Sequence, residues 1–352
     1  MDLKAFISGC AGLALSDDER HFFAATRPCG LILFARNCGT PEQVAALVTQ
    51  FKDAVESDDV LVLIDQEGGR VQRLRAPLWR TMPPARCYGR LYESDPEAAK
   101  CAAFASARLI AQELRDLGIT VNTTPVLDVP QQGAQEIIGD RAFSTDPDIV
   151  AALGGAVVEG CLAGGVLPVI KHVPGHGRAL ADSHLSLPKI DVDPDELEAT
   201  DFRPFRALRD APLAMTAHVL IPAFDDRRPA TTSPVIMGEV IRNRLGLTGL
   251  IMSDDLGMKA LRGPFAERAR DTIAAGCDVA LHCSGALGEM VEVGGAVPPL
   301  AGLAAERFAR ARAALHEPQP FDSAESLALV AQASERSSLI AQKDLGDLMG
   351  RA

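Results

Sequence analysis

Basic residues are scarce in this sequence of 352 residues: 35 lysines and arginines stand against 47 aspartates and glutamates, a formal net charge of −12 at pH 7. Binding to nucleic acid without sequence preference requires a basic surface, so nucleic acid is not an expected partner. No run of 18 apolar residues occurs, so no membrane-spanning helix is expected. Hydrophobic residues nevertheless make up 47% of the chain, which indicates a large buried core. We expect a soluble protein whose ligand is neutral or is held by a local basic cluster.

Motifs for nucleotides and structural metals are also missing. No GxGxxG follows an early apolar run and no P-loop occurs, which argues against a Rossmann or P-loop fold. The eight cysteines form no CxxC pair, so a zinc ribbon or a thioredoxin motif is not expected. Most of the cysteines lie in apolar stretches, and we interpret them as buried thiols in a reducing compartment.

Residues 1–20 lack the pattern of a signal peptide. Their apolar run is short, is interrupted by Ser8 and Gly9, and is followed by acidic residues. We therefore expect a cytoplasmic protein.

Short apolar runs alternate with segments of helical pattern. Eight runs have about the length of a strand and are apolar on both faces, as strands buried between helices are: 6–15, 30–34, 61–65, 119–122, 167–171, 213–218, 249–254 and 279–283. Candidate helices lie at 41–56, 95–116, 147–164, 234–245 and 264–275. This alternation predicts an α/β protein with a (β/α)8 TIM barrel, and an open doubly wound sheet is the alternative.

The barrel accounts for most of the chain. We expect a single catalytic domain over residues 1–352, with the barrel at about 6–290 and extra C-terminal helices at about 297–350. These helices, 297–315 and 323–350, are expected to pack on the outside. No linker, low-complexity segment or internal repeat marks a second domain.

Polar residues end several of the apolar runs, although burying a charged group is unfavourable unless it is paired or used. The residues are Asp65, Gln66 and Glu67, then Asn122, Lys171 and His172, then His218, and last Ser253, Asp254 and Asp255. In a barrel, the C-terminal ends of the strands converge on one rim, where the chemistry takes place. Their convergence predicts a functional site.

The segment 171–188 (KHVPGHGRALADSHLSLP) holds three of the seven histidines, His172, His176 and His184. Asp182 lies two residues before His184, and a carboxylate that close can hydrogen-bond the imidazole and fix its tautomer. This pair is a candidate general acid and base. Histidines and an aspartate in one loop are also typical of a metal site, so that interpretation stays open.

A carboxylate at the tip of a strand is a candidate nucleophile. Asp254 ends the run GLIMSD, and a fixed carboxylate there can attack an electrophilic carbon. Asp255 is expected to point elsewhere because side chains alternate along a strand, but spacing alone does not choose between the two. Arg70, Arg73 and Arg141 are candidate donors to ligand oxygens.

Several of these motifs together resemble glycoside hydrolase family 3. The motifs are IDQEGGRVQRL, IIGDRAFSTDP, IKHVPGHG with DSHLSLP, TAHVLIP and LTGLIMSDDLGM, and the resemblance extends from about residue 6 to 285. It is strongest to the single-domain β-N-acetylglucosaminidases (β-hexosaminidases) of the family. Val173 stands where the family often has Phe, a packing change beside the site.

The resemblance implies a (β/α)8 barrel and the removal of terminal β-linked N-acetylglucosamine with retention of configuration, without a cofactor or a metal. It implies that Asp254 is the nucleophile and that His184, paired with Asp182, is the acid and base. The sugar-binding residues that it implies are Asp65, Arg73, Arg141, Lys171 and His172.

The resemblance also implies the substrate. This is a muropeptide, N-acetylglucosamine linked to 1,6-anhydro-N-acetylmuramic acid with or without its peptide, in the recycling of bacterial peptidoglycan. We expect no nucleic-acid or membrane partner, and a monomer or a weak homo-oligomer.

Three alternatives remain open. In a phosphorylase or transglycosylase, phosphate or another sugar would intercept the glycosyl-enzyme. A metal-dependent barrel hydrolase would use His172, His176, His184 and Asp182 as ligands. A sugar-binding protein without activity is the third, although the segments for both nucleophile and acid are present.

Overall fold

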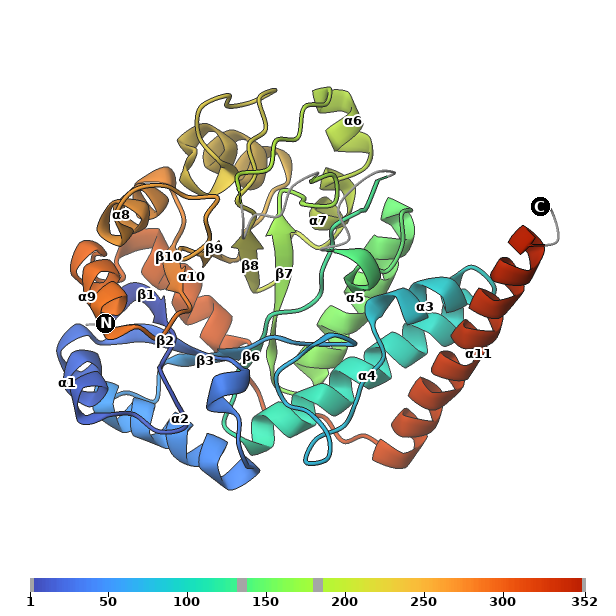
Figure 1. The fold of residues 1–352 in the computed structure, drawn as a ribbon, viewed down its shortest axis with the longest axis horizontal. Helices are drawn as coiled ribbons and strands as arrows, with labels where there is room; N and C mark the ends of the chain where they lie inside the picture. Colours follow the sequence, from blue (N-terminus) through green and yellow to red (C-terminus); the bar gives the residue numbers. More distant parts are fainter. Residues whose placement is uncertain (1–2, 132–137, 180–185, 350–352) are drawn as a thin grey trace.

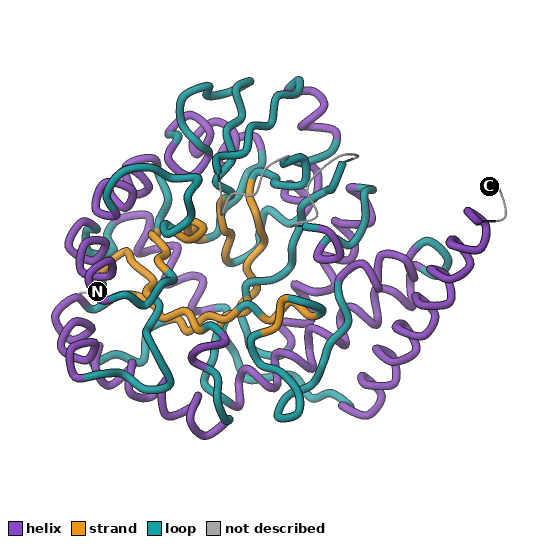
Figure 2. Tube along the Cα trace, in the orientation of Figure 1, coloured by secondary structure: helices purple, strands orange, loops and turns teal. Residues whose placement is uncertain are grey.

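Eight parallel strands close into a barrel at the centre of the molecule (Figures 1 and 2). The computed structural model describes residues 3–131, 138–179 and 186–349, with side chains to residue 342. The order around the barrel is β1-β10-β9-β8-β7-β6-β3-β2. The strands are β1 (Lys4–Ser8), β2 (Pro28–Leu33), β3 (Leu61–Ile64), β6 (Val121–Asn122), β7 (Leu167–Val173), β8 (Leu213–Thr216), β9 (Leu250–Asp255) and β10 (Val279–His282). The predicted (β/α)8 barrel is confirmed.

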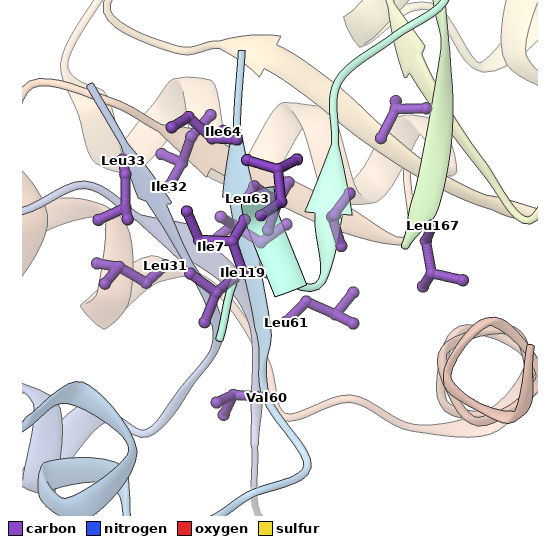
Figure 3. Packing of buried hydrophobic residues seen from close by; sticks show 14 of the residues in the cluster. Ile7, Leu31, Ile32, Leu33, Val60, Leu61, Leu63, Ile64, Ile119 and Leu167 are labelled. Carbon is purple, nitrogen blue, oxygen red and sulfur yellow. The ribbon is translucent and has the colours of Figure 1, made fainter. Parts of the chain in front are cut away.

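The strands are apolar on both faces because side chains fill the inside of the barrel and helices cover the outside. Every residue of β2, β3, β8 and β10 is buried. Figure 3 shows leucines and isoleucines of β2 and β3 packed together with Ile7 of β1 and with Ile119. A rigid core of this kind fixes where each strand ends.

Helices surround the barrel. They are α1 (Asp17–Thr26), α2 (Pro41–Val55), α3 (Ala85–Tyr92), α4 (Pro96–Asp116), α5 (Pro147–Ala163), α6 (Pro194–Ala199), α7 (Phe202–Ala207), α8 (Phe265–Ala275), α9 (Leu287–Ala296), α10 (Gly302–Ala313) and α11 (Ser323–Met349). A π-helical segment, Ile236–Arg244, stands where a helix at 234–245 was expected. A short hairpin, β4 (Gln66–Gly68) with β5 (Val71–Gln72), follows β3. No helix in the described part of the chain is long and apolar enough to cross a membrane.

Local sequence sets the ends of several helices. Helices α2, α4 and α5 each begin with proline after a capping side chain, Thr40, Asp95 or Asp146, which accepts a hydrogen bond from a backbone N–H of the first turn. Proline is favoured there because its missing N–H would have no partner anyway.

The first predicted strand was too long. The strand ends at Ser8 rather than at residue 15, and α1 begins after Ser16, which forms a capping box with Glu19. Gly9 packs closely against the segment that follows β10. A Cβ at this position would be only 2.5 Å from the carbonyl oxygen of Cys283. The apolar letters after Ser8 therefore belong to a loop at the rim of the barrel.

The C-terminal helices also differ in detail from the prediction. The helix expected from residue 297 begins at Gly302, because Pro298 and Pro299 run extended beside β1 and the Pro298 carbonyl accepts from the Ala5 N–H. Helix α9 was missed. Helix α11 packs on α3 and α4, and its end projects away from the barrel (Figure 1).

Candidate active site

The C-terminal ends of the strands surround a cavity of about 630 Å³. Asp65 follows β3, Lys171 and His172 lie in β7, and Asp254 lies in β9. Arg73 and Arg141 complete the set of predicted residues that line the cavity. Six of the eight predicted site residues therefore meet in one cavity, as the rule for strand ends predicts. His184 and Asp182 lie outside the described residues.

One wall of the cavity is a network of paired charges. Asp65 accepts a hydrogen bond from Arg73 at 2.7 Å and others from Thr123 and from Lys171 (3.3 Å). The Nζ of Lys171 lies 2.6 Å from Oε1 of Glu67. Because each charge has at least one opposite partner, the strand ends can hold these groups away from bulk water.

Glu67 joins this network to Arg141. The guanidinium donates two parallel hydrogen bonds, each of 2.8 Å, to the two carboxylate oxygens of Glu67. This bidentate geometry fixes the plane of the Arg141 side chain at the cavity wall. Arg141 comes from the short 3-10 helix Gly139–Arg141, so the pair ties this loop to the hairpin after β3.

The electrostatics keep both carboxylates of the network ionised. Burial alone would raise the pKa of Asp65, but Lys171 and Arg73 outweigh it and hold the pKa well below its usual range. Burial likewise opposes ionisation of Glu67, but Arg141 and Lys171 lower its pKa to about 2. Two stable carboxylates and three cations therefore face the ligand at neutral pH.

A second network holds the segment after β7. The buried carboxylate of Asp128 lies 2.6 Å from Nδ1 of His172 and accepts hydrogen bonds from the backbone N–H groups of His172 and His176. Burial opposes the charge of Asp128, but His172 beside it lowers the pKa of this carboxyl overall. Because Asp128 occupies Nδ1, the other ring nitrogen of His172 remains for a ligand.

The ring of His176 lines the same cavity, and the residue joins the second network through its backbone N–H alone. Its ring is buried, and neither ring nitrogen has a hydrogen-bond partner among the residues that the structure describes. Burial lowers the pKa of His176 to about 4, with Asp128 opposing this shift, so the ring is neutral at pH 7. The two ring centroids of His172 and His176 are 5.9 Å apart.

Asp254 differs from the other carboxylates because no ion pair to it is found among the described side chains. Its Oδ1 accepts the backbone N–H of Asp255 at 2.8 Å. Asp255 also borders the cavity. Its Oδ1, however, accepts the backbone N–H groups of Gly257 and Cys283 at 2.9 and 3.0 Å. Asp254 is thus the less engaged carboxylate.

The backbone that carries both aspartates is held by His218. Its Nε2 lies 3.0 Å from the carbonyl oxygen of Asp255, and its Nδ1 lies 2.7 Å from Oγ1 of Thr231. Because a carbonyl only accepts, Nε2 carries the proton and donates it to the Asp255 carbonyl. Burial lowers the pKa of His218, although Asp254 opposes the shift, so the ring stays neutral in this arrangement.

Sequence reasoning missed several of these residues. Glu67 stood at a strand end but received no role, and Asp128 and Thr123 were not considered. A carboxylate inside the apolar stretch TPVLDVP was a signal for Asp128, because a buried charge needs a partner. In the described part of the chain, no three His, Cys, Asp or Glu residues are grouped to hold a metal, and the alternative metal site also needs His184 and Asp182.

The comparisons with known sequences agree with one another. The glycosyl hydrolase family 3 N-terminal domain matches residues 6–311. A protein of Alkalilimnicola ehrlichii named beta-hexosaminidase is 41% identical over 288 residues, which are 81% of this chain and 82% of the relative. A beta-hexosaminidase of Methylococcus capsulatus is 42% identical over 277 residues, 78% of this chain and 80% of the relative.

The comparisons with solved structures point the same way. NagZ from Neisseria gonorrhoeae superimposes with a TM-score of 0.84 at 32% identity, over 95% of this chain and 98% of that one. The same protein in complex with N-trifluoroacetyl-D-glucosamine superimposes with a TM-score of 0.79 at 31% identity, over 95% of this chain and 99% of that one.

The barrel, the carboxylates at its strand ends and these relatives define an enzyme of the glycoside hydrolase class. The chain belongs to glycosyl hydrolase family 3. Its β-hexosaminidase relatives span nearly the same length.

Proposed function

We propose that this enzyme is a retaining exo-β-N-acetylglucosaminidase that removes the terminal N-acetylglucosamine of muropeptides. The observation that carries the proposal is the carboxylate of Asp254, which borders a sugar-sized cavity without a cationic partner among the described side chains. The relatives named beta-hexosaminidase and the glucosamine derivative bound to NagZ support the class of sugar.

In the proposed mechanism, Asp254 attacks the anomeric carbon and forms a covalent glycosyl-enzyme. A carboxylate paired with a lysine or arginine would be a weaker nucleophile, because the cation would share its charge. Asp65 and Glu67 are paired in this way, and Asp255 is engaged by two backbone N–H groups. The geometry therefore favours Asp254 among the four carboxylates at the cavity.

We assign the acid and base to His184, oriented by Asp182, on the strength of the DSH motif and the family resemblance. The imidazolium protonates the leaving oxygen, and the neutral ring then deprotonates the water that releases the sugar. Both residues lie outside the described residues, so this part of the proposal rests on the sequence. The segment that precedes them borders the cavity at His176, and the Ala179 N–H donates to the His176 carbonyl at 3.1 Å.

In this proposal, five side chains of the cavity bind and orient the sugar: Lys171, Arg141, Asp65, Arg73 and His172. Their mutual pairing fixes donors and acceptors before the substrate arrives, so little reorganisation is needed on binding. The free ring nitrogen of His172 is suited to a sugar hydroxyl, because Asp128 holds the opposite side of the ring.

An arginine at the cavity, Arg36, favours a leaving group that carries a negative charge. Arg36 is exposed, lines the cavity and has no carboxylate partner among the described side chains. Its guanidinium lies 5.0 Å from the ring centroid of Phe34, with Arg73 at 5.1 Å from the same ring. The guanidinium donates to the backbone carbonyls of Cys10 and Cys283, which hold the cation beside the aromatic face. A cation held there without a carboxylate partner among the described side chains fits a sugar that carries a carboxylate, as the lactyl group of N-acetylmuramic acid does.

The role of Arg36 is tested with two substrates. Replacing Arg36 with Met is expected to raise KM severalfold for N-acetylglucosaminyl-anhydro-N-acetylmuramic acid and to leave the neutral nitrophenyl glycoside nearly unchanged. An equal effect on both substrates would remove Arg36 from the recognition of the acid.

We further propose that the enzyme acts in the cytoplasm of a bacterium, on cell-wall fragments that have been imported for recycling. The leaving group and the reducing environment inferred for the thiols support this assignment. The eight cysteines are all free in the structure, and six of them are buried.

The proposal is tested by trapping. A 5-fluoro N-acetylglucosaminyl donor slows the release of the sugar, and digestion followed by mass spectrometry is expected to find the label on Asp254. A label on Asp255 would reassign the nucleophile. Product analysis with and without phosphate separates hydrolysis from phosphorolysis, and activity after exhaustive chelation tests the metal-dependent alternative.

A further inference from the structure

The mechanism above gives no role to His176, which lines the cavity. The residue lies in the wall of the cavity with a relative exposure of 6%, and both ring nitrogens lack a hydrogen-bond partner in the described part of the chain. Most buried polar atoms in proteins are hydrogen-bonded, so an orphaned pair in a cavity wall indicates a partner that arrives with the ligand.

The buried carboxylate of Asp128 holds His176 in place at the cavity. Asp128 accepts the backbone N–H of His176 at 2.7 Å while it also holds His172 through Nδ1. One buried carboxylate therefore sets the positions of both histidines at the cavity. His172 is oriented through its ring, whereas His176 is held through its backbone and keeps both ring nitrogens available.

The charge state of the ring narrows the choice of partner. A neutral imidazole, which burial favours here, presents one N–H donor and one bare nitrogen. Arg141 and His172 beside it further disfavour a proton on the ring, although Asp128 and Asp254 oppose this. A neutral polar group is therefore the suitable partner, and the hydroxyl and acetamido groups of an amino sugar are of this kind.

We propose that His176 is a substrate-contacting residue whose ring hydrogen-bonds to the amino sugar seated against Asp254. The inference rests on the proposed function and adds a specificity residue to it. The contact is to the sugar rather than to the leaving group, because His176 lies on the wall shared with His172, Arg141 and Asp254.

Replacing His176 with Leu separates this role from a structural one. In the free enzyme the change removes two unpaired buried polar atoms and no hydrogen bond of the ring, so Tm is expected to stay the same or to rise. The affinity for N-acetylglucosamine, measured by calorimetry, is expected to fall tenfold or more, which corresponds to 1.4 kcal/mol. The loss in kcat/KM is expected to be equal for aryl glycosides with good and poor leaving groups.

Thr272 provides a matched control. Its hydroxyl is also buried without a partner among the described residues, but Thr272 lies in α8 and does not line the cavity. Replacing Thr272 with Val is expected to raise Tm or to leave it unchanged, with the same affinity for N-acetylglucosamine as the wild type. His176→Asn, which keeps one donor and one acceptor, is expected to recover part of the affinity lost in His176→Leu.

A measurement on the wild-type protein does not depend on how the variants fold. In protein labelled with 15N at histidine, the ring nitrogen signals of His176, assigned from the spectrum of His176→Asn, are expected to shift when N-acetylglucosamine saturates the site. Unshifted signals, or a His176→Leu enzyme with wild-type affinity, would overturn the inference. A wild-type enzyme that neither binds N-acetylglucosamine nor cleaves its aryl glycosides would instead contradict the proposed function.

Discussion

The ion pair between Glu67 and Arg141 is expected to make a measurable contribution to the free energy of unfolding. Glu67 is buried, accepts two hydrogen bonds of 2.8 Å from Arg141 and lies 2.6 Å from the Nζ of Lys171. Its pKa falls from the ordinary 4.5 to about 2 in the folded protein. At about 1.36 kcal/mol for each unit, the ionised form contributes about 3 kcal/mol to folding at pH 7. Replacing Glu67 with Gln is expected to lower the free energy of unfolding by about this amount.

The sign of the pH dependence follows from the direction of the shift. Because the folded protein holds the carboxylate below its unfolded pKa, the contribution is complete above about pH 4.5 and is lost as the pH falls towards 2. By pH 3 less than half of the contribution remains. The difference between wild type and Glu67→Gln is therefore expected to shrink over this range.

Urea unfolding, followed by circular dichroism at a series of pH values, measures this difference. A Glu97→Gln variant serves as the control, since Glu97 forms an exposed pair with Lys100 on α4 and its loss is expected to change nothing measurable. A Glu67→Gln protein as stable as the wild type at pH 7, or a difference that grows as the pH falls, would refute the electrostatic reasoning.

Three further predictions concern the reaction. Asp254→Ala is expected to reduce turnover of an aryl β-N-acetylglucosaminide to background, whereas an active Asp254→Ala enzyme and an inactive Asp255→Ala enzyme would exchange the roles of the two residues. His184→Ala is expected to slow substrates with poor leaving groups more than activated aryl glycosides, and equal losses would argue against His184 as the acid. His218→Phe is expected to lower kcat by tenfold or more with little change in KM, because the carbonyl of Asp255 loses its hydrogen-bond donor. His218→Gln is expected to restore part of kcat. An unchanged kcat in His218→Phe would show that this hydrogen bond does not position Asp254.

The rule for barrel strand ends explains why much of the site was predictable. Asp65, Lys171 and Asp254 each end an apolar run, and parallel strands bring such ends to one rim whatever the loops do. The alternation of runs also predicted the barrel, because a strand buried on both faces leaves a continuous apolar pattern.

The rest depends on contacts between distant segments. Asp128 is 44 residues from His172, and its role follows from a hydrogen bond that spacing cannot show. The role of the Glu67 carboxylate likewise depends on its hydrogen bonds with Arg141, which is 74 residues away in the sequence. The apolar residues after Ser8 have the pattern of a strand, but they form a loop at the rim of the barrel. Tertiary contacts at Gly9 decide where the strand ends, and the sequence pattern does not show them.

The stereochemistry of the first product tests the central claim most directly. Attack by Asp254 followed by attack of water inverts C1 twice, so proton NMR in the first minutes of hydrolysis is expected to show β-N-acetylglucosamine, which only later mutarotates. If the first sugar released is the α-anomer, water attacks C1 directly and no covalent intermediate forms on Asp254.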